Sequence, residues 1–297
     1  MSAGWVAGTV RAKAMARRVL GADTARQLAA SPSLAAAQHA LLPTSLRDAA
    51  QPGLSLAAAQ HAVAETMLWD LRVLAGWLPR DGVSLLRLLA AWFEIANVDE
   101  LLQALADAPA GPEFQLGALA TAWPRLSESR TVVELRQALA ASAWGDPGGD
   151  SARDIRVAMR ARWATRVATS GDRTRAWAAA AVAVMQPGGR ADPGIADGGR
   201  PRAARLAPAG RTRHGPPGGP RPDVTAPGQS TEPWLAEADW WRRVEREGQA
   251  LLRSAAADSG PVLGAVAVMA ADARRVRAAL ACAARGGVDL AAYDALA

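Results

Sequence analysis

The sequence has a single cysteine, Cys282, among its 297 residues. One thiol cannot form a disulfide within the chain, so nothing supports an oxidising compartment. We expect Cys282 to be a small, buried apolar side chain on a helix. Long apolar runs are also missing, since the longest extends only from Val262 to Ala271. A membrane-spanning helix needs roughly 20 such residues. The sequence therefore predicts no direct membrane span.

Histidine is almost as scarce, with only His39, His61 and His214. There is no His-x-x-x-His motif and no pair of cysteines, so a zinc site has no ligand set. A phosphate loop, a glycine-rich dinucleotide motif after a strand and a serine nucleophile elbow are all missing. We therefore predict no catalytic residue, no cofactor and no metal site, and hence no enzyme. An α-helical enzyme whose site the sequence does not reveal is the alternative.

Acidic residues are absent before Asp23, whereas Arg11, Lys13, Arg17 and Arg18 precede it. An interfacial helix at the membrane surface is one interpretation. Arg11 and Lys13 would lie on different sides of a helix, however, so we expect an ordinary first helix.

The net charge of +6 is concentrated in residues 187–230, which hold seven Arg and three Asp. A nucleic-acid-binding protein carries its basic surplus on a folded face, and the rest of the chain has almost none. We therefore expect no nucleic-acid partner. The same residues include ten Gly and nine Pro and have no periodicity. Such a composition predicts disorder, because too little apolar surface is available to offset the chain entropy.

Elsewhere, apolar residues recur at helical spacing. One continuous seam follows Ser55, a plausible N-cap, and consists of Val63, Met67, Leu71, Leu74 and Leu78. Pro79 and Gly82 are expected to end this helix, Ser84 to cap the next, and Asp99 to begin a further short helix to Leu105. Thr131 and Glu134 fit a capping box for a helix that reaches about Ala141.

Helical pattern continues over 152–168 and 172–185, and it resumes at Trp234. The octapeptide Ser-Leu-Ala-Ala-Ala-Gln-His-Ala occurs twice, at 33–40 and 55–62, and we interpret both copies as helix starts. No run of alternating β-branched residues is present. The predicted fold class is therefore all-α, with more than half of the residues in helices.

Three polar residues lie close to one helix face between apolar neighbours: Arg87, Glu94 and Asn97. The favoured interpretation is a buried seam between packed helices in which Glu94 pairs with a group such as Arg87. The alternative is a contact strip for a partner helix. Tryptophans raise the same choice between core and partner surface: Trp69, Trp77, Trp92, Trp123, Trp144, Trp163, Trp177, Trp240 and Trp241.

Several stretches, in order, resemble the C/d family of stalk proteins in the rotary V-type and A-type ATPases, in its bacterial form. The most informative is LRLLAAWFEIANV at 86–98, which follows the tryptophan-rich TMLWDLRVLAGWLP at 66–79. The others are WVAGTVRAKAMARR at 5–18, FQLGALATAWPRL at 114–126, WGDPG at 144–148, ADWWRRVEREGQALL at 238–252 and VLGAVAVMAADARRVRAALACAAR at 262–285.

The resemblance implies three similar helical units that form a funnel with a central cavity. It implies a non-catalytic protein that couples the rotating stalk, subunits D and F, to the proteolipid c ring during ion transport or ATP synthesis. The location implied is peripheral, on the cytoplasmic face of the plasma membrane. A helical adaptor or regulatory protein unrelated to rotary ATPases is the alternative.

The expected organisation has four parts. Residues 1–107 form a first helical unit and 108–186 a second. Residues 187–230 form a disordered or frame-shifted segment, because the chain departs there from the family and an out-of-frame stretch of GC-rich DNA encodes Gly, Pro and Arg. Residues 231–297 form a C-terminal helical segment, so that the third unit is disrupted.

Overall fold

A computed structural model describes residues 3–51, 53–171 and 233–296. Within these ranges the chain forms α-helices and two short 3-10 helices, with no strand, which confirms the all-α prediction. The α-helices are α1 (Ala3–Ala16), α2 (Ala22–Ala29), α3 (Leu34–Leu41), α4 (Leu56–Ala75), α5 (Arg80–Ala104), α6 (Trp123–Leu126), α7 (Val132–Ala140), α8 (Ala152–Thr169), α10 (Pro233–Leu252), α11 (Ser259–Ala283) and α12 (Leu290–Leu296). The 3-10 helices are η1 (Arg47–Ala50) and η2 (Gly117–Leu119).

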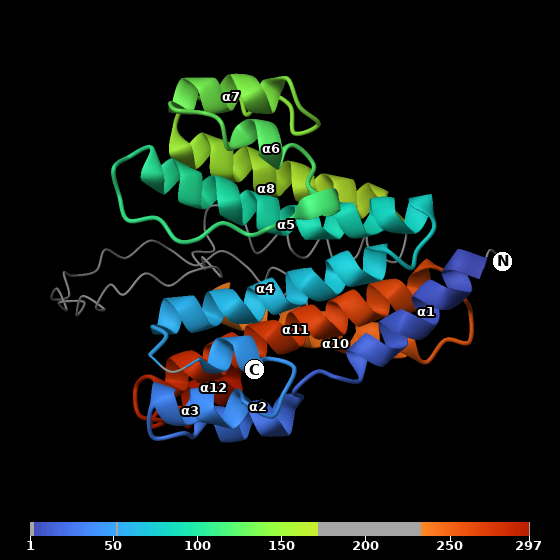
Figure 1. Cartoon of the computed structure of the whole chain (residues 1–297), viewed down its shortest axis with the longest axis vertical. Helices are drawn as coiled ribbons and strands as arrows, with labels where there is room; N and C mark the ends of the chain where they lie inside the picture. The colour runs from blue at the N-terminus through green and yellow to red at the C-terminus, as the bar shows by residue number, and fades with distance from the viewer. Residues whose placement is uncertain (1–2, 52, 172–232, 297) are drawn as a thin grey trace, which may run out of the picture.

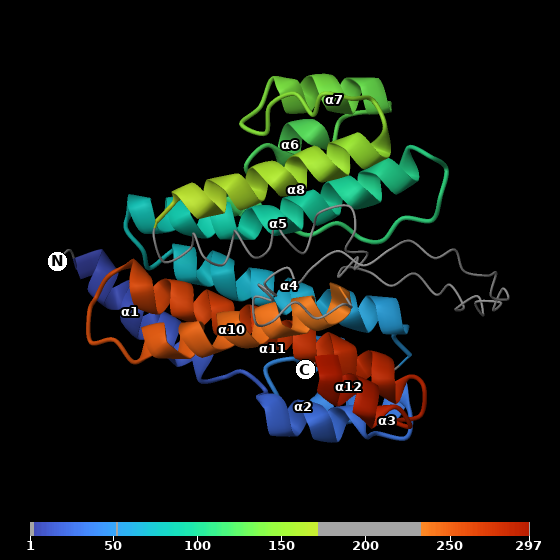
Figure 2. The same cartoon turned by 180° about the vertical axis from the view of Figure 1, so that it is seen from behind.

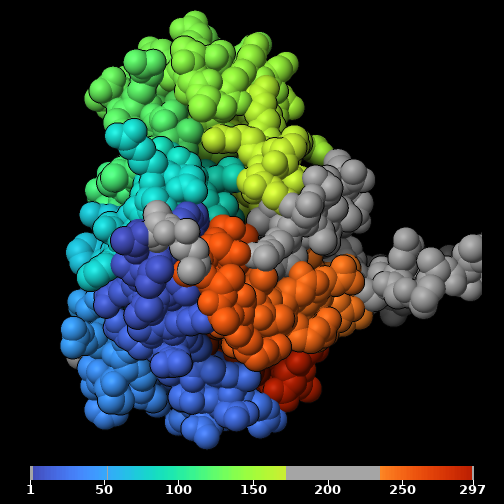
Figure 3. Space-filling view, turned by 90° about the vertical axis from the view of Figure 1, so that its right-hand side faces the viewer, coloured from blue at the N-terminus to red at the C-terminus, as the bar shows by residue number. Residues whose placement is uncertain are grey.

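The helices are arranged in two groups (Figures 1 and 2). The middle of the chain forms one group, in which α5 packs along α8 with α6 and α7 beyond them. The two outer parts of the chain form the other group, α1–α4 with α10–α12. Figure 3 shows α1 at the surface of this second group. The short link between α4 and α5 joins the two groups.

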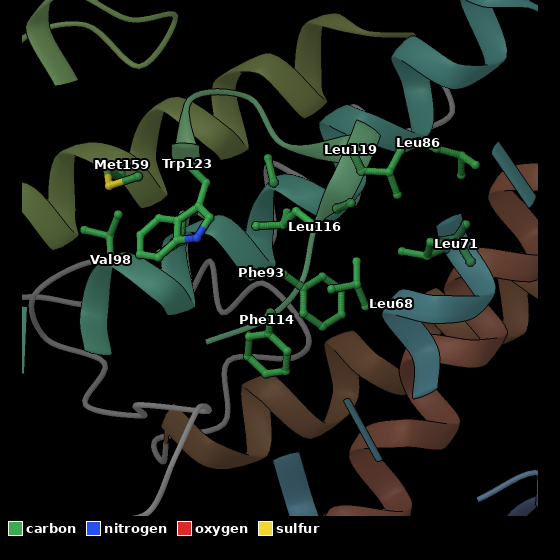
Figure 4. Packing of buried hydrophobic residues seen from close by; sticks show 14 of the residues in the cluster. Leu68, Leu71, Leu86, Phe93, Val98, Phe114, Leu116, Leu119, Trp123 and Met159 are labelled. Atoms are coloured by element: carbon green, nitrogen blue, oxygen red, sulfur yellow. The ribbon is translucent and has the colours of Figure 1, made fainter. Parts of the chain in front are cut away.

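One of the apolar clusters in the described residues extends through both groups. Leu68 and Leu71 of α4 meet Leu86 and Phe93 of α5 there, and Phe114 from the connection after α5 contacts the Phe93 ring edge-on at 5.1 Å (Figure 4). Residues of α8 and α11 belong to the same cluster. Apolar contacts therefore unite helices from the segments 1–107, 108–186 and 231–297 in one body.

Helix α11 lies at the centre of the second group and packs against α1, α2, α3, α4, α10 and α12. Its crossing with α10 depends on glycine. A Cβ atom on Gly264 would lie 2.6 Å from Gly248 O, and one on Gly248 would lie 2.9 Å from Ala267 Cβ. Trp240, Val244 and Leu251 of α10 also pack against α11.

Helix starts agree well with the sequence. Ser33 and Ser55, the first residues of the two octapeptides, each accept a hydrogen bond of 3.2 Å from the N–H three residues later. Both are N-caps, as predicted. Thr131 accepts from Glu134 N at 3.1 Å, whereas the Glu134 carboxylate accepts from Arg130 N at 2.7 Å, one residue before the expected N–H.

The predicted break within α5 is wrong. Helix α5 begins at Arg80, directly after Pro79, and continues without interruption to Ala104. Ser84 does not cap it, since its hydroxyl donates to Arg80 O inside the first turns. Asp99 lies within the helix and pairs with Arg156 and Arg160 of α8. Ser84 and Asp99 thus bond to groups other than the free N–H groups at the start of a helix, so neither residue marks a helix end.

The predicted helix at 172–185 and the segment 187–230 lie outside the described residues. The three-unit funnel and the boundaries after residues 107, 186 and 230 stay predictions.

Candidate functional site

Polar residues on one face of α5 form a series of buried hydrogen bonds to the segment that follows the helix. Glu94 has no exposed surface. Its carboxylate accepts hydrogen bonds from Thr121 N at 2.6 Å, Ala122 N at 2.8 Å and the Trp144 indole N–H at 2.6 Å. Three donors compensate for the loss of hydration of this buried charge. The prediction that Glu94 is buried and has hydrogen-bond partners is therefore confirmed, but these partners lie in connecting segments rather than on a helix packed against α5.

Asn97, three residues later, binds the same connecting segment. Its side-chain oxygen accepts from Phe114 N at 2.7 Å, and its amide nitrogen donates to Phe114 O at 2.9 Å. Glu100, a further three residues along, accepts from Gly111 N. All three side chains are buried. We call Glu94, Asn97 and Glu100 the α5 polar stripe.

The α5 polar stripe holds the irregular connection between α5 and α6 along the helix. A connection without regular structure leaves backbone groups unpaired, and buried groups of this kind need partners. The stripe supplies them at three points, residues 111, 114 and 121–122, while apolar side chains of the connection enter the core. The stripe therefore fixes the position of one segment of the chain relative to another.

The predicted pairing of Glu94 with Arg87 is wrong. Arg87 donates to Ala118 O at 3.1 Å, at the N-terminal end of the same line of contacts. Its partner is thus again the backbone of the connection. Sequence reasoning also missed Glu100, although the spacing of three residues from Asn97 is a signal that could have found it.

A second group of charges joins α5 to α8. Asp99 is largely buried, and it receives hydrogen bonds from Arg156 at 2.9 Å and Arg160 at 3.1 Å. Burial raises the pKa of Asp99, and the two arginines oppose that shift. This ion pair is partly shielded from solvent, so it contributes to the contact between the two helices.

A third group of charges lies on α11, and the sequence analysis did not find it. Asp272 accepts from Leu20 N at 2.9 Å and Gly21 N at 2.8 Å, and so holds the link between α1 and α2 from a distant part of the chain. Arg275 pairs with Glu245 of α10, and Arg274 pairs with Glu237 at 3.4 Å. These contacts attach the C-terminal helices to one another and to the N-terminal ones.

The histidines and the cysteine do not converge. His39 is exposed. His61 stacks on Phe114 with ring centroids 4.3 Å apart, and burial together with Arg277 lowers its pKa. Cys282 is buried, as predicted, and His214 lies outside the described residues. In the described ranges, no group of three or more His, Cys, Asp or Glu side chains is placed to hold a metal ion.

The tryptophans divide between core and surface. Trp144 and Trp123 are buried, and Trp163 donates to Leu88 O at 3.0 Å. Trp69 and Trp77 of the α4 region are about half exposed. The Arg72 guanidinium lies 5.2 Å from the Trp69 ring centroid. Trp69 and Trp77 are therefore not part of the core, and a partner surface there stays a prediction.

The chain matches no protein-family model and no curated protein. None of the helices in the described ranges combines the length and the apolar composition that crossing a bilayer requires. The side-chain networks that the structure does contain connect one segment of the chain to another. The arrangement is that of a helical scaffold with exposed aromatic side chains.

Proposed function

We propose that this chain is a non-catalytic central-stalk component of a rotary V/A-type ATPase, similar to the C/d family. In that role it couples the rotating stalk, subunits D and F, to the proteolipid c ring, on the cytoplasmic face of the membrane. The observation that carries the proposal is the ordered series of sequence stretches that resemble this family, from Trp5 to Arg285.

The structure supports the proposal in two ways. The stretch with the most specific resemblance, 86–98, contains Glu94 and Asn97 of the α5 polar stripe, which position the following connection. The resemblance thus includes residues that shape the fold, and it is not limited to alanine-rich surface. The charged networks of the described residues also join helices to one another, which suits a protein that transmits force without chemistry.

Co-purification tests the proposal. The chain is co-expressed with tagged subunits D and F of the same organism, and we expect it to elute with them in stoichiometric amount. Subunits A and B of the catalytic head, co-expressed without D and F, serve as the control and should not retain it. A chain that stays monomeric beside correctly assembled D and F would overturn the proposal and favour a helical adaptor of another system.

Nucleotide binding gives a second test. Titration of the purified chain with ATP should show no saturable binding in the micromolar range, because the sequence has no phosphate loop. Saturable binding would contradict a non-catalytic role.

A further inference from the structure

Helix α1 carries apolar side chains on its outer face. Val6 is 46% exposed and Val10 is 65% exposed. Ala14 follows four residues after Val10 and is exposed as well, so the three side chains lie on one face of the helix. The opposite face is buried: Ala12 and Met15 belong to the core that α1 shares with α4 and α11. We call Val6, Val10 and Ala14 the α1 ridge.

Cations lie on both sides of the α1 ridge. At 100° per residue, Lys13 falls on one flank and Arg11 on the other. Arg17 and Arg18 follow directly after the last residue of the helix. Lys13 donates to Ser254 O at 2.6 Å, so its position is fixed. Neither Arg17 nor Arg18 forms an ion pair with a described residue.

Two carboxylates lie near Arg18, those of Asp70 on α4 and Asp272 on α11. Asp70 is half-buried, and burial raises its pKa while Arg18 and Arg11 oppose the shift. Asp272 already accepts hydrogen bonds from Leu20 N and Gly21 N. The four cations therefore outnumber the carboxylates beside them. The α1 ridge is therefore an apolar strip in a positive environment, and Figure 3 shows that α1 is open to solvent in this region.

A cleft opens at the C-terminal end of the α1 ridge. It has a volume of about 530 Å³ and lies between the α1–α2 link and the turn after α3. Arg18 and Arg47 line it together with the hydroxyl-bearing residues Thr24 and Ser45, and its lining among the described residues includes no acidic side chain. The cleft extends the positive region of the α1 ridge into a hollow that a side chain can enter.

We propose that the α1 ridge docks an amphipathic helix of another protein, whose apolar strip is flanked by Asp and Glu and places one acidic side chain in the cleft. Apolar contact excludes water along the strip, and the opposite charges fix register and partner choice. The inference does not depend on the proposed function, because any protein that presents such a helix fits.

Two other occupants fit less well. Interfacial helices insert Trp, Phe or Leu into a membrane, whereas the α1 ridge has only Val and Ala. Small side chains of this kind allow a partner helix to approach closely. A second copy would meet the same surface across a two-fold axis, so cations would face cations.

A matched pair of synthetic helical peptides tests the proposal. Each has about 18 residues, long enough to cover α1, and the same Leu/Ala strip, flanked by Glu in one peptide and by Lys in the other. Fluorescence anisotropy should show binding of the Glu peptide to the full chain and no binding of the Lys peptide. Val10→Glu should weaken binding by about tenfold or more. Val157→Glu on α8 is the control, since Val157 is 55% exposed and lies on a helix of the other group.

The cleft is tested separately. Charge reversal with Arg18→Glu and Arg47→Glu should weaken binding of the Glu peptide by a similar factor. Arg153→Glu, at an exposed position of α8, should leave its binding unchanged. Equal binding of both peptides, or binding that Val10→Glu does not alter, would overturn the proposal. Two further results would also overturn it: Val10-dependent binding to phosphatidylglycerol vesicles without peptide binding, and Val10-dependent self-association in sedimentation.

Discussion

The α5 polar stripe and the α1 ridge reverse the usual relation between residue type and burial. The α5 polar stripe consists of two carboxylates and an amide, yet it is buried. The α1 ridge consists of two valines and an alanine, yet it is exposed. The difference lies in the partners: backbone N–H groups of the connection after α5 surround the first, and nothing in the described residues covers the second. Burial of a polar group follows from available hydrogen-bond partners rather than from hydrophobicity.

Glu94→Ala is the strongest test of this comparison. The substitution leaves Thr121 N, Ala122 N and the Trp144 indole without their acceptor, so we expect a loss of about 3 kcal/mol or more in the free energy of unfolding. Urea denaturation measures the loss. Glu128→Ala, at an exposed position, should change the free energy by less than about 0.5 kcal/mol. A free energy of unfolding that Glu94→Ala leaves unchanged would mean that the stripe is not structural.

Asn97→Leu should have the next largest effect. Leucine has a similar size but cannot pair with Phe114 N or Phe114 O, so two buried backbone groups lose their partners. We expect a loss of about 2 kcal/mol, again from urea denaturation. Asn97→Asp keeps the acceptor but replaces the donor to Phe114 O with a buried carboxylate oxygen, so its cost should be at least as large. A loss below about 0.5 kcal/mol for Asn97→Leu would mean that apolar packing rather than hydrogen bonding determines this position.

The pH dependence of stability separates a buried acid from an exposed one. Burial raises the pKa of Asp99 in the folded chain, so the folded state holds its proton more tightly than the unfolded state. The protonated carboxyl therefore stabilises the folded state fully when the pH is below the pKa of Asp99 in the unfolded chain. This stabilisation is lost as the pH rises through the pKa of Asp99 in the folded chain. The stability advantage of the wild type over Asp99→Asn should therefore decrease as the pH rises above about 4, the ordinary pKa of an aspartate.

Asp146 provides the opposite case. Hydrogen bonds from Arg136 lower the pKa of Asp146 in the folded chain. Asp146 therefore stabilises the folded state when the pH is above its pKa in the unfolded chain, and this stabilisation is lost as the pH falls through its pKa in the folded chain. The advantage of the wild type over Asp146→Asn should increase with pH over the acidic range. Thermal unfolding at a series of pH values measures both profiles. Parallel profiles for the two variants would contradict the distinction.

Val10→Glu should have the smallest effect on stability. The side chain is exposed, so a charge there meets water and nearby cations, and the free energy of unfolding should change by less than about 0.5 kcal/mol. Val262→Glu, at a fully buried position on α11, is the contrast and should prevent stable folding. A large loss from Val10→Glu would show that the α1 ridge is covered in the folded protein.

Much of the secondary structure could be predicted from local pattern. Serine N-caps at Ser33 and Ser55, the capping residue Thr131 and the periodicity of α4 all produced correct helix starts. The errors at Ser84 and Asp99 have one cause: Ser and Asp are common at helix ends, but their side chains here bond to a helix carbonyl and to arginines of α8. A sequence does not show which of these partners a polar side chain will have.

The candidate site was predicted only in part. Burial of Glu94 and Asn97 followed from their apolar neighbours, but the partners did not, because they belong to residues 111–122 and Trp144, up to 50 positions away. The hydrogen bond from Leu20 N, in the link before α2, to Asp272 spans 252 residues and has no local signal at all. Contacts of this range depend on how the helices assemble.

The sequence by itself determined that this chain is helical and where most helices begin, because caps and the 3.6-residue period are properties of neighbouring residues. The tertiary structure alone decided which faces are covered. It placed the C-terminal helices beside the first four, gave the α5 polar stripe its backbone donors and left the α1 ridge open. Packing between distant segments determines which faces are buried, and it depends on the shapes of the helices and on backbone groups that still need hydrogen-bond partners.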